Sequence, residues 1–293
     1  MSLETISLGD LTASFVDNAE HGVHRAGYNG IASLRHRTST RNLFVDKYAG
    51  LNLEHIFSGV GEDNREVFFE PRYAPMELKR ISDDTVELYQ PPTPTFHLVS
   101  WTRFQVVAPH YIDMTFTCRA TQHSFHYGYI GLFWASYINA PLDKSMYFRG
   151  GLEGQESSWQ QLVTHRHNDE STVRHKDDNF RLQWEEDSRD TLYKNLSPLR
   201  YHLPFFYGNF EDLTWAVMFD RHDIIRLTHS PSGGGLNAER QTTNPAWDFQ
   251  FIIPGYDVAT DYSFRVRAFL QPRITRQRMM EEYEAWREML QAH

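Results

Sequence analysis

The strongest constraint on the fold is an alternation of apolar and polar side chains near the C-terminal end of the chain, within residues 236–270. Residues 262–270 divide into two sets by this alternation. One set is Tyr262, Phe264, Val266, Ala268 and Leu270, and the other is Ser263, Arg265, Arg267 and Phe269. A period of two is typical of a half-buried β-strand. Residues 247–253 predict a second strand, and the turn sequence of residues 254–257 separates the two.

The same rhythm recurs along most of the chain, with turn residues between short runs. Strands are predicted over residues 5–8, 11–16, 27–34, 42–45, 50–57, 111–120, 125–138, 203–207, 213–220 and 223–230, with further runs within residues 66–107. The proline cluster of residues 91–94 must be a connection, because proline cannot donate a hydrogen bond within a central strand. This pattern predicts an all-β protein, as a large antiparallel β-sandwich or a barrel.

One segment differs from the rest and predicts a helix. Residues 274–291 contain no glycine or proline, and Ile274, Met279, Tyr283, Trp286 and Leu290 recur at nearly helical spacing. We expect this C-terminal α-helix, within residues 272–292, to begin just after Pro272 and to cover an edge or a face of a sheet. The predicted organisation is a single β-sandwich domain over residues 1–293 with this helix packed on it.

Charge and cysteine content narrow the classes of function. The formal net charge is −9 without a long basic run, so nucleic acid is not an expected partner. Cys118 is the single cysteine, which excludes an intramolecular disulfide. It falls on the apolar face of a predicted strand, where a small buried side chain is the favoured interpretation over a nucleophile.

The termini and the hydropathy pattern predict a cytoplasmic protein without membrane contact. The first fifteen residues lack the positive start and the apolar run of a signal peptide. No stretch approaches the roughly 20 apolar residues that span a bilayer. The pattern leaves the oligomeric state open.

Residues 150–190 are polar and charged, and we interpret them as a long excursion over the surface. His165 and His167 stand two apart, which on a strand is a common spacing for two metal ligands, and His175 follows nearby. Because the segment is typical of a loop, we predict neither a metal nor another cofactor. A metal-dependent enzyme with histidine ligands stays an alternative.

Several segments, in the same order along the chain, resemble the galactose mutarotase-like family, which includes the aldose 1-epimerases. Residues 239–246 resemble its catalytic glutamate followed by a polar turn with proline, and residues 253–255 and 262–265 resemble the strands and Pro-Gly turn that follow. Residues 27–34 and 121–127 resemble an early hairpin strand and a histidine-containing segment. Gln122 and Arg240 depart from the family pattern. The resemblance implies a β-supersandwich fold.

The same resemblance implies a general base at Glu239 and a general acid at His123 or His126. Opening a sugar hemiacetal removes a proton from the anomeric hydroxyl and gives one to the ring oxygen, which suits a carboxylate and an imidazolium. Residues three apart face opposite sides of a regular strand, so the residues alone leave open which histidine faces a cleft. A bulge at Gly128 would change that register. The alternative for all three is an ordinary solvated or hydrogen-bonded side chain.

Five further residues are candidates for binding a sugar: Arg35, Glu54, Tyr127, Trp247 and Asp248. An arginine can bind hydroxyls or a sugar carboxylate, and the aromatic rings offer flat faces, although a solvated or a core position suits most such residues equally. Glu54 and His55 are neighbours in a predicted strand, so we expect them to point to opposite faces.

These observations lead to three functional hypotheses. The first is a carbohydrate-active enzyme that acts on a small sugar by acid–base chemistry, as an epimerase (an isomerase), a lyase or a hydrolase. The second is a non-catalytic carbohydrate-binding protein that keeps the cleft and its aromatic side chains. The third is the histidine-based metalloenzyme.

Overall fold

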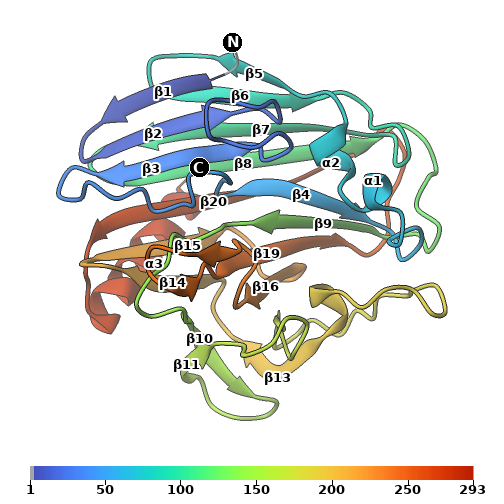
Figure 1. Cartoon of the computed structure of the whole chain (residues 1–293). Helices are drawn as coiled ribbons and strands as arrows, with labels where there is room; N and C mark the ends of the chain where they lie inside the picture. Colours follow the sequence, from blue (N-terminus) through green and yellow to red (C-terminus); the bar gives the residue numbers. More distant parts are fainter. Residues whose placement is uncertain (1–2, 293) are drawn as a thin grey trace.

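The computed structural model describes residues 3–292, and strands make up most of them (Figure 1). The N-terminal part forms a small antiparallel sheet of β1 (Leu3–Leu8), β2 (Leu11–Val16) and β3 (Gly30–His36), in that order. Phe15 of β2 packs on Phe104 of the large sheet, with ring centroids 5.3 Å apart. The small sheet is therefore a layer over part of the large one.

The large sheet contains fifteen strands. Their spatial order is β4 (Asn52–Phe57), β9 (Ile130–Ala135), β19 (Ala246–Ile253), β16 (Ile225–Ser230), β12 (Thr172–His175), β13 (Leu196–Tyr201), β10 (Met146–Leu152), β14 (Phe205–Phe210), β15 (Leu213–Phe219), β20 (Asp261–Pro272), β8 (Tyr111–Ala120), β7 (Leu98–Val107), β6 (Thr85–Gln90) and β5 (Glu77–Arg80), with β11 (Ser158–Leu162) paired to β10. Its pairings are antiparallel except for β12 with β13. The predicted all-β class and large antiparallel sandwich are confirmed.

The sheet folds over on itself, so strands that are distant in its order face each other across the core. Trp134 of β9 contacts Phe116 of β8 at 4.8 Å and Phe264 of β20 at 5.1 Å between ring centroids. Strand β20 joins the two halves, because it pairs with β8 on one side and with β15 on the other. Its predicted apolar face is the face that enters this core.

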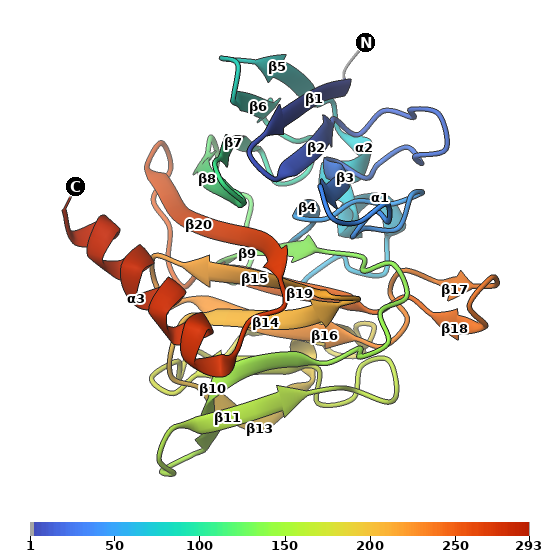
Figure 2. The ribbon, with the colours of Figure 1, turned by 90° about the vertical axis from the view of Figure 1, so that its left-hand side faces the viewer.

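Helix α3 (Arg276–Gln291) covers the opposite face of β20 and its neighbours (Figure 2). Met279, Tyr283 and Trp286 are the buried apolar residues of the helix, as the spacing predicted. The helix begins two residues later than expected, because the hydroxyl of Thr275 caps it by accepting from the backbone N–H of Arg278 at 3.1 Å.

Several local features differ from the sequence predictions. The short helices α1 (Arg65–Phe68), α2 (Glu70–Tyr73) and η1 (Leu192–Lys194) were not expected. The run predicted over residues 125–138 is a strand only at β9, since a turn at Gly128, with a φ of +72°, precedes it. Residues 42–45 contribute one isolated bridge, between Phe44 and Ile138. A two-stranded hairpin of β17 (Leu236–Asn237) and β18 (Thr242–Thr243) projects from the body (Figure 2).

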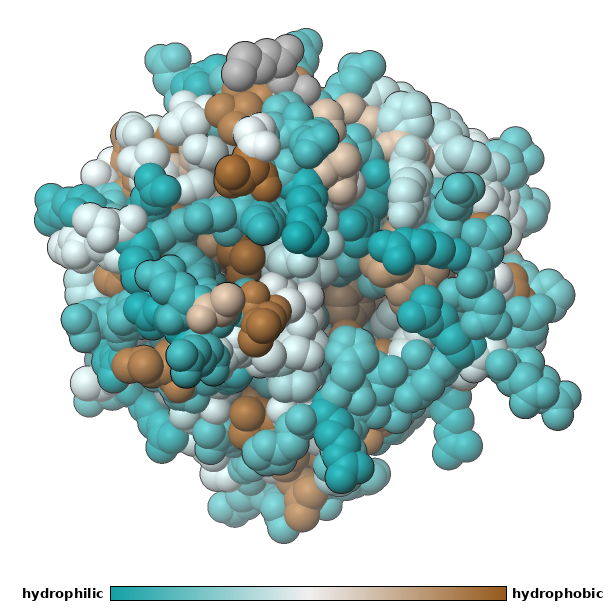
Figure 3. All heavy atoms as spheres, in the orientation of Figure 1, coloured by the Kyte–Doolittle hydropathy of each residue, from teal (hydrophilic) through white to brown (hydrophobic). Residues whose placement is uncertain are grey.

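The surface seen in Figure 3 is mostly hydrophilic, and its apolar side chains lie in small separate spots. Large apolar patches mark surfaces that bind other proteins or membranes, and this face carries none. Among residues 3–292, no helix has the length and apolar character needed to cross a membrane. Cys118 is a buried free thiol, as predicted.

Close packing around Trp247 gives a test of the sandwich. The indole of Trp247 fills the space that a Cβ atom on Gly208 of β14 would occupy. We therefore expect Gly208→Ala to lower the free energy of unfolding by about 1–3 kcal/mol, the range for overpacked cores. Gly255→Ala is the matched control, since a Cβ there meets nothing within 4 Å, and its effect should stay within about 0.5 kcal/mol. Chemical denaturation measures both; equal effects would contradict this packing.

Candidate functional site

A cavity of about 290 Å³ lies over the face of β4, β9 and β19 that points away from the main core. Helices α1 and α2 and the segments around residues 167–168 and 189–193 form its walls. Phe68, Phe69, Phe133 and Tyr193 supply aromatic surface, whereas Glu54, His55, Arg72 and Asp248 supply polar groups. The volume is at the lower end for small-molecule sites, so the cavity suits a ligand of about one ring. We call it the Glu54 pocket.

A β-bulge in β4 gives the pocket two of its polar groups. Leu53 pairs with Trp134 and His55 pairs with Phe133, so Glu54 is an extra residue without a partner in β9. Glu54 and His55 consequently both line the pocket, and His55 Nε2 lies 3.9 Å from Glu54 Oε2. The prediction that they point to opposite faces is wrong, because the bulge interrupts the alternation on which it rested.

The carboxylate of Glu54 is buried and fully engaged. The hydroxyl of Tyr137 lies 2.7 Å from both of its oxygens and donates to them. Arg72 Nη1 donates to Oε1 at 3.2 Å, and its guanidinium stacks over Tyr28 at 3.9 Å and over Phe69 at 4.8 Å. A buried charge requires such partners, so Arg72 and Tyr137 hold Glu54 in one position.

His55 is neutral and held in a single tautomer. Its Nδ1–H donates to the carbonyl oxygen of Phe68 at 2.8 Å, which leaves Nε2 as the unprotonated nitrogen, on the side of Glu54. Burial lowers the pKa of His55 to about 4, although the charge of Glu54 acts in the opposite direction. At neutral pH the imidazole can therefore accept a proton or a hydrogen bond at Nε2.

Asp248 is a second buried carboxyl group in the pocket, and its surroundings favour the protonated form. Its side chain is 1% exposed, and Oδ1 accepts a hydrogen bond from the backbone N–H of Ser136 at 2.9 Å. Burial raises the pKa of Asp248 well above its ordinary value, and the negative charge of Glu54 raises it further. Burial thus favours the protonated form of Asp248, in the same pocket as the ion-paired carboxylate of Glu54.

The polar segment of residues 150–190 contains β11 and β12, and its later turns reach the pocket. His167 and Asn168 line the wall, as does Arg189, whose guanidinium lies 4.7 Å from the ring centroid of Phe68. His165 does not line the pocket and lies instead in a separate surface depression. The segment turns at these residues and is not a strand, so the spacing of His165 and His167 does not give them a common face.

Of the predicted catalytic and sugar-binding residues, Glu54 and Asp248 line the pocket and the others do not. Glu239 is exposed in the turn between β17 and β18, on the hairpin that projects in Figure 2. His123 and His126 are exposed in the connection between β8 and β9, where their rings contact Tyr256 and Tyr127 respectively. No hydrogen bond or ion pair joins Glu239 to either histidine within residues 3–292.

The remaining candidates occupy three different environments. Arg35 is exposed on β3, opposite Thr12 of β2, in the small sheet. Tyr127 is half-buried near the pocket's aromatic layer without lining the cavity. Trp247 is fully buried in the main core, and its indole N–H donates to the carbonyl oxygen of Lys144 at 2.8 Å. Trp247 therefore presents no face to a ligand, because its side chain points away from that of Asp248.

With this geometry in place, comparison with solved structures identifies the architecture. The chain aligns with the GalM/aldose epimerase homologue from C. elegans, with a TM-score of 0.55 and 11% identity over 93% of this chain and 99% of the other. It also aligns with a galactose mutarotase related enzyme from Lactobacillus acidophilus, with a TM-score of 0.53 and 9% identity over 92% and 97%. The chain has the fold of galactose mutarotase-like proteins. No family model and no curated protein sequence matches it.

Two groups of pocket residues were missed from the sequence. Arg72, Phe68 and Phe69 lie in or between the one-turn helices, and the signals for those helices are weak. Asn64 accepts a hydrogen bond from the backbone N–H of Glu66 as the cap of α1, and a proline is at the start of α2. Tyr137 follows an apolar run that resembles core, and its contact with Glu54 depends on strand pairing that no local pattern specifies.

The pKa of His55 predicts a pH dependence of stability. Between pH 6.5 and pH 4 the unfolded chain binds a proton at His55 that the folded protein does not, so stability falls as the pH falls through this window. We expect His55→Asn, whose amide can still donate to the carbonyl of Phe68, to reduce that slope by about 1.4 kcal/mol per pH unit at most. Urea unfolding at pH 7, 6 and 5 measures it. The His97→Asn variant is the control. If the slope of His55→Asn equals that of the wild type and of this control, the burial of a neutral imidazole at His55 would be contradicted.

Proposed function

We propose that the protein is a carbohydrate-active enzyme that binds a small sugar in the Glu54 pocket and acts on it by general acid–base catalysis. The observation that carries the proposal is that one cavity is lined both by the ion-paired carboxylate of Glu54 and by the carboxyl group of Asp248, whose burial favours its protonated form. A carboxylate and a carboxyl group that is kept protonated can serve as the base and the acid of one site. The similarity of fold to aldose epimerase homologues supports a sugar as the ligand.

The roles follow from the protonation states. The carboxylate of Glu54 removes the proton of the anomeric hydroxyl, and the carboxyl of Asp248 gives its proton to the ring oxygen. The bond between the anomeric carbon and the ring oxygen then breaks as the carbonyl of the open-chain sugar forms. Closure of the ring on the other face of that carbonyl, with both proton transfers reversed, yields the other anomer. Tyr137 and Arg72 keep the carboxylate of Glu54 in position.

The residues that line the pocket suggest which classes of sugar to screen. Arg65, Arg72 and Arg189 line it, and in the part of the chain that the structure describes the only carboxylate that accepts a hydrogen bond from any of their guanidinium groups is that of Glu54, from Arg72. Because guanidinium groups pair with carboxylates, the screen should include sugar acids in addition to neutral aldoses. Aromatic side chains in the same lining, such as Phe133 and Tyr193, offer apolar surface to the face of a sugar ring.

A non-catalytic carbohydrate-binding protein is the second candidate, and one observation favours it. Both oxygens of Glu54 already accept hydrogen bonds from Tyr137, and one accepts from Arg72 as well. Hydrogen bonds to the charged form of a carboxylate stabilise it and weaken it as a base. Under this alternative, Glu54 would bind a hydroxyl without removing its proton.

Conservative substitutions test the catalytic proposal. We expect Glu54→Gln and Asp248→Asn each to lower kcat by about 10²–10⁴-fold on the best sugar found, as is typical for the loss of a general base or acid. Asn reproduces the shape of the protonated Asp248 and keeps an acceptor for Ser136, so the fold should survive. Anomer exchange followed by NMR measures turnover, circular dichroism checks folding, and Glu77→Gln, on the exposed strand β5, is the matched control.

The other outcomes separate the alternatives. A wild type that binds a sugar but turns over none of the sugars tested would favour the binding protein, provided that Glu54→Gln loses this binding. A loss of turnover in Glu239→Gln, with Glu54→Gln active, would move catalysis to the hairpin residue and to His123 or His126, as the family resemblance implies. Activity within threefold of wild type in both pocket variants would end the proposal for this pocket.

A further inference from the structure

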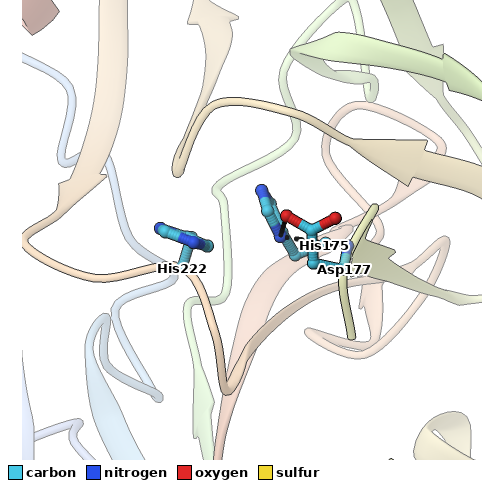
Figure 4. A group of neighbouring side chains, drawn as sticks. All are labelled: His175, Asp177 and His222. Carbon is cyan, nitrogen blue, oxygen red and sulfur yellow. Dashed lines mark hydrogen bonds and ion pairs between the residues drawn. The ribbon is translucent and has the colours of Figure 1, made fainter. Parts of the chain in front are cut away.

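A second group of chemically competent side chains lies outside the Glu54 pocket (Figure 4). His175 is the last residue of β12, Asp177 follows it two residues later, and His222 lies in the connection between β15 and β16. Each offers one possible ligand atom, and these atoms all lie within 4.8 Å of one another. None of the three residues lines the Glu54 pocket, so this group is independent of the proposed function.

His175 is the fixed member of the group. Its side chain is buried, and its ring packs on Tyr201 with centroids 5.1 Å apart. The backbone N–H of Asp177 donates to His175 Nδ1 at 3.2 Å, so Nδ1 carries a lone pair directed toward Asp177. Asp177 Oδ2 lies 3.7 Å from the same nitrogen. An ion bound at Nδ1 would replace this long hydrogen bond, and the carboxylate of Asp177 is near enough to reach the same ion.

Asp177 and His222 are the adjustable members, because both side chains are exposed. The His222 ring lies beside the His175 ring, with centroids 4.2 Å apart. Ligands of a tetrahedral zinc ion, at about 2.0–2.1 Å from the metal, are roughly 3.4 Å from one another. The present separations exceed that value by an amount that rotation of two exposed side chains can remove.

Room for further ligands is available beside the group. The three side chains line a depression of about 460 Å³ that also includes His202, Asp220 and Tyr283. Lys176 and Arg287 line it too, and their positive charge opposes the binding of a cation. We therefore expect an affinity in the micromolar range, which is weaker than that of a closed structural site.

We propose that His175, Asp177 and His222 form a binding site for a divalent transition-metal ion, with Zn²⁺ as the best fit. Two imidazoles and one carboxylate are the donor set of open zinc sites, in which water or a ligand occupies the fourth position. A bound ion would link the end of β12 to the β15–β16 connection and thereby stabilise the folded protein.

Titration of chelator-treated protein with ZnCl₂ at pH 7.5 tests the site by calorimetry. We expect one Zn²⁺ bound per chain with a dissociation constant of about 1–100 μM, and a higher Tm in its presence. His222→Ala and Asp177→Asn should each weaken binding at least tenfold. Both residues are exposed, so these variants are expected to fold, and circular dichroism verifies it.

His97→Ala is the matched control, since that histidine bonds to Ser124 and lies outside the group, and it should bind like wild type. A wild type that binds no Zn²⁺ below 1 mM would overturn the proposal. So would binding that is unchanged in both His222→Ala and Asp177→Asn, because the ion would then occupy other residues.

Discussion

A buried carboxylate determines how the candidate site is built. Glu54 is 5% exposed, and a charge so far from water is tolerated only when other groups replace the lost hydration. Arg72 supplies the opposite charge from α2, and Tyr137 supplies a hydroxyl from the chain that follows β9. The ion pair with Arg72 ties α2 to β4, where the helix forms part of the pocket wall. Removal of Arg72 would leave the charge without its ion pair, and removal of Tyr137 would leave it without a hydrogen-bond donor.

The order of strands explains why residues distant in sequence meet in the pocket. Strands β4, β9 and β19 are neighbours in the large sheet, so Glu54, Tyr137 and Asp248 come together although almost 200 residues separate the first from the last. One face of these strands enters the main core, where Trp134 and Phe249 stack with centroids 5.1 Å apart. The opposite face is left for polar groups and for an aromatic layer. One face of these strands thus belongs to the packed core, and the other face carries the side chains of the candidate site.

The sequence was sufficient for the fold class because its signals are local. The alternation in residues 262–270 and the helical spacing of Met279, Tyr283 and Trp286 both report a face that must be buried, and both are confirmed. The site was harder to predict, because it depends on non-local events. The bulge that turns Glu54 and His55 to one side carries no glycine or other marker, and the contact of Tyr137 with Glu54 exists only after β4 pairs with β9.

The family resemblance pointed to the fold and to a different set of catalytic residues. Glu239, His123 and His126 occupy exposed connections, whereas Asp248 and Glu54, the acid and base that we propose, are buried. A crystal structure of the protein with a bound sugar tests most directly which of these two sets of residues forms the site. We expect a sugar ring in the Glu54 pocket, with hydroxyl or ring oxygens at about 2.6–3.2 Å from the carboxyl groups of Glu54 and Asp248. A sugar bound instead beside Glu239, His123 or His126, with none in the Glu54 pocket, would contradict the proposed site.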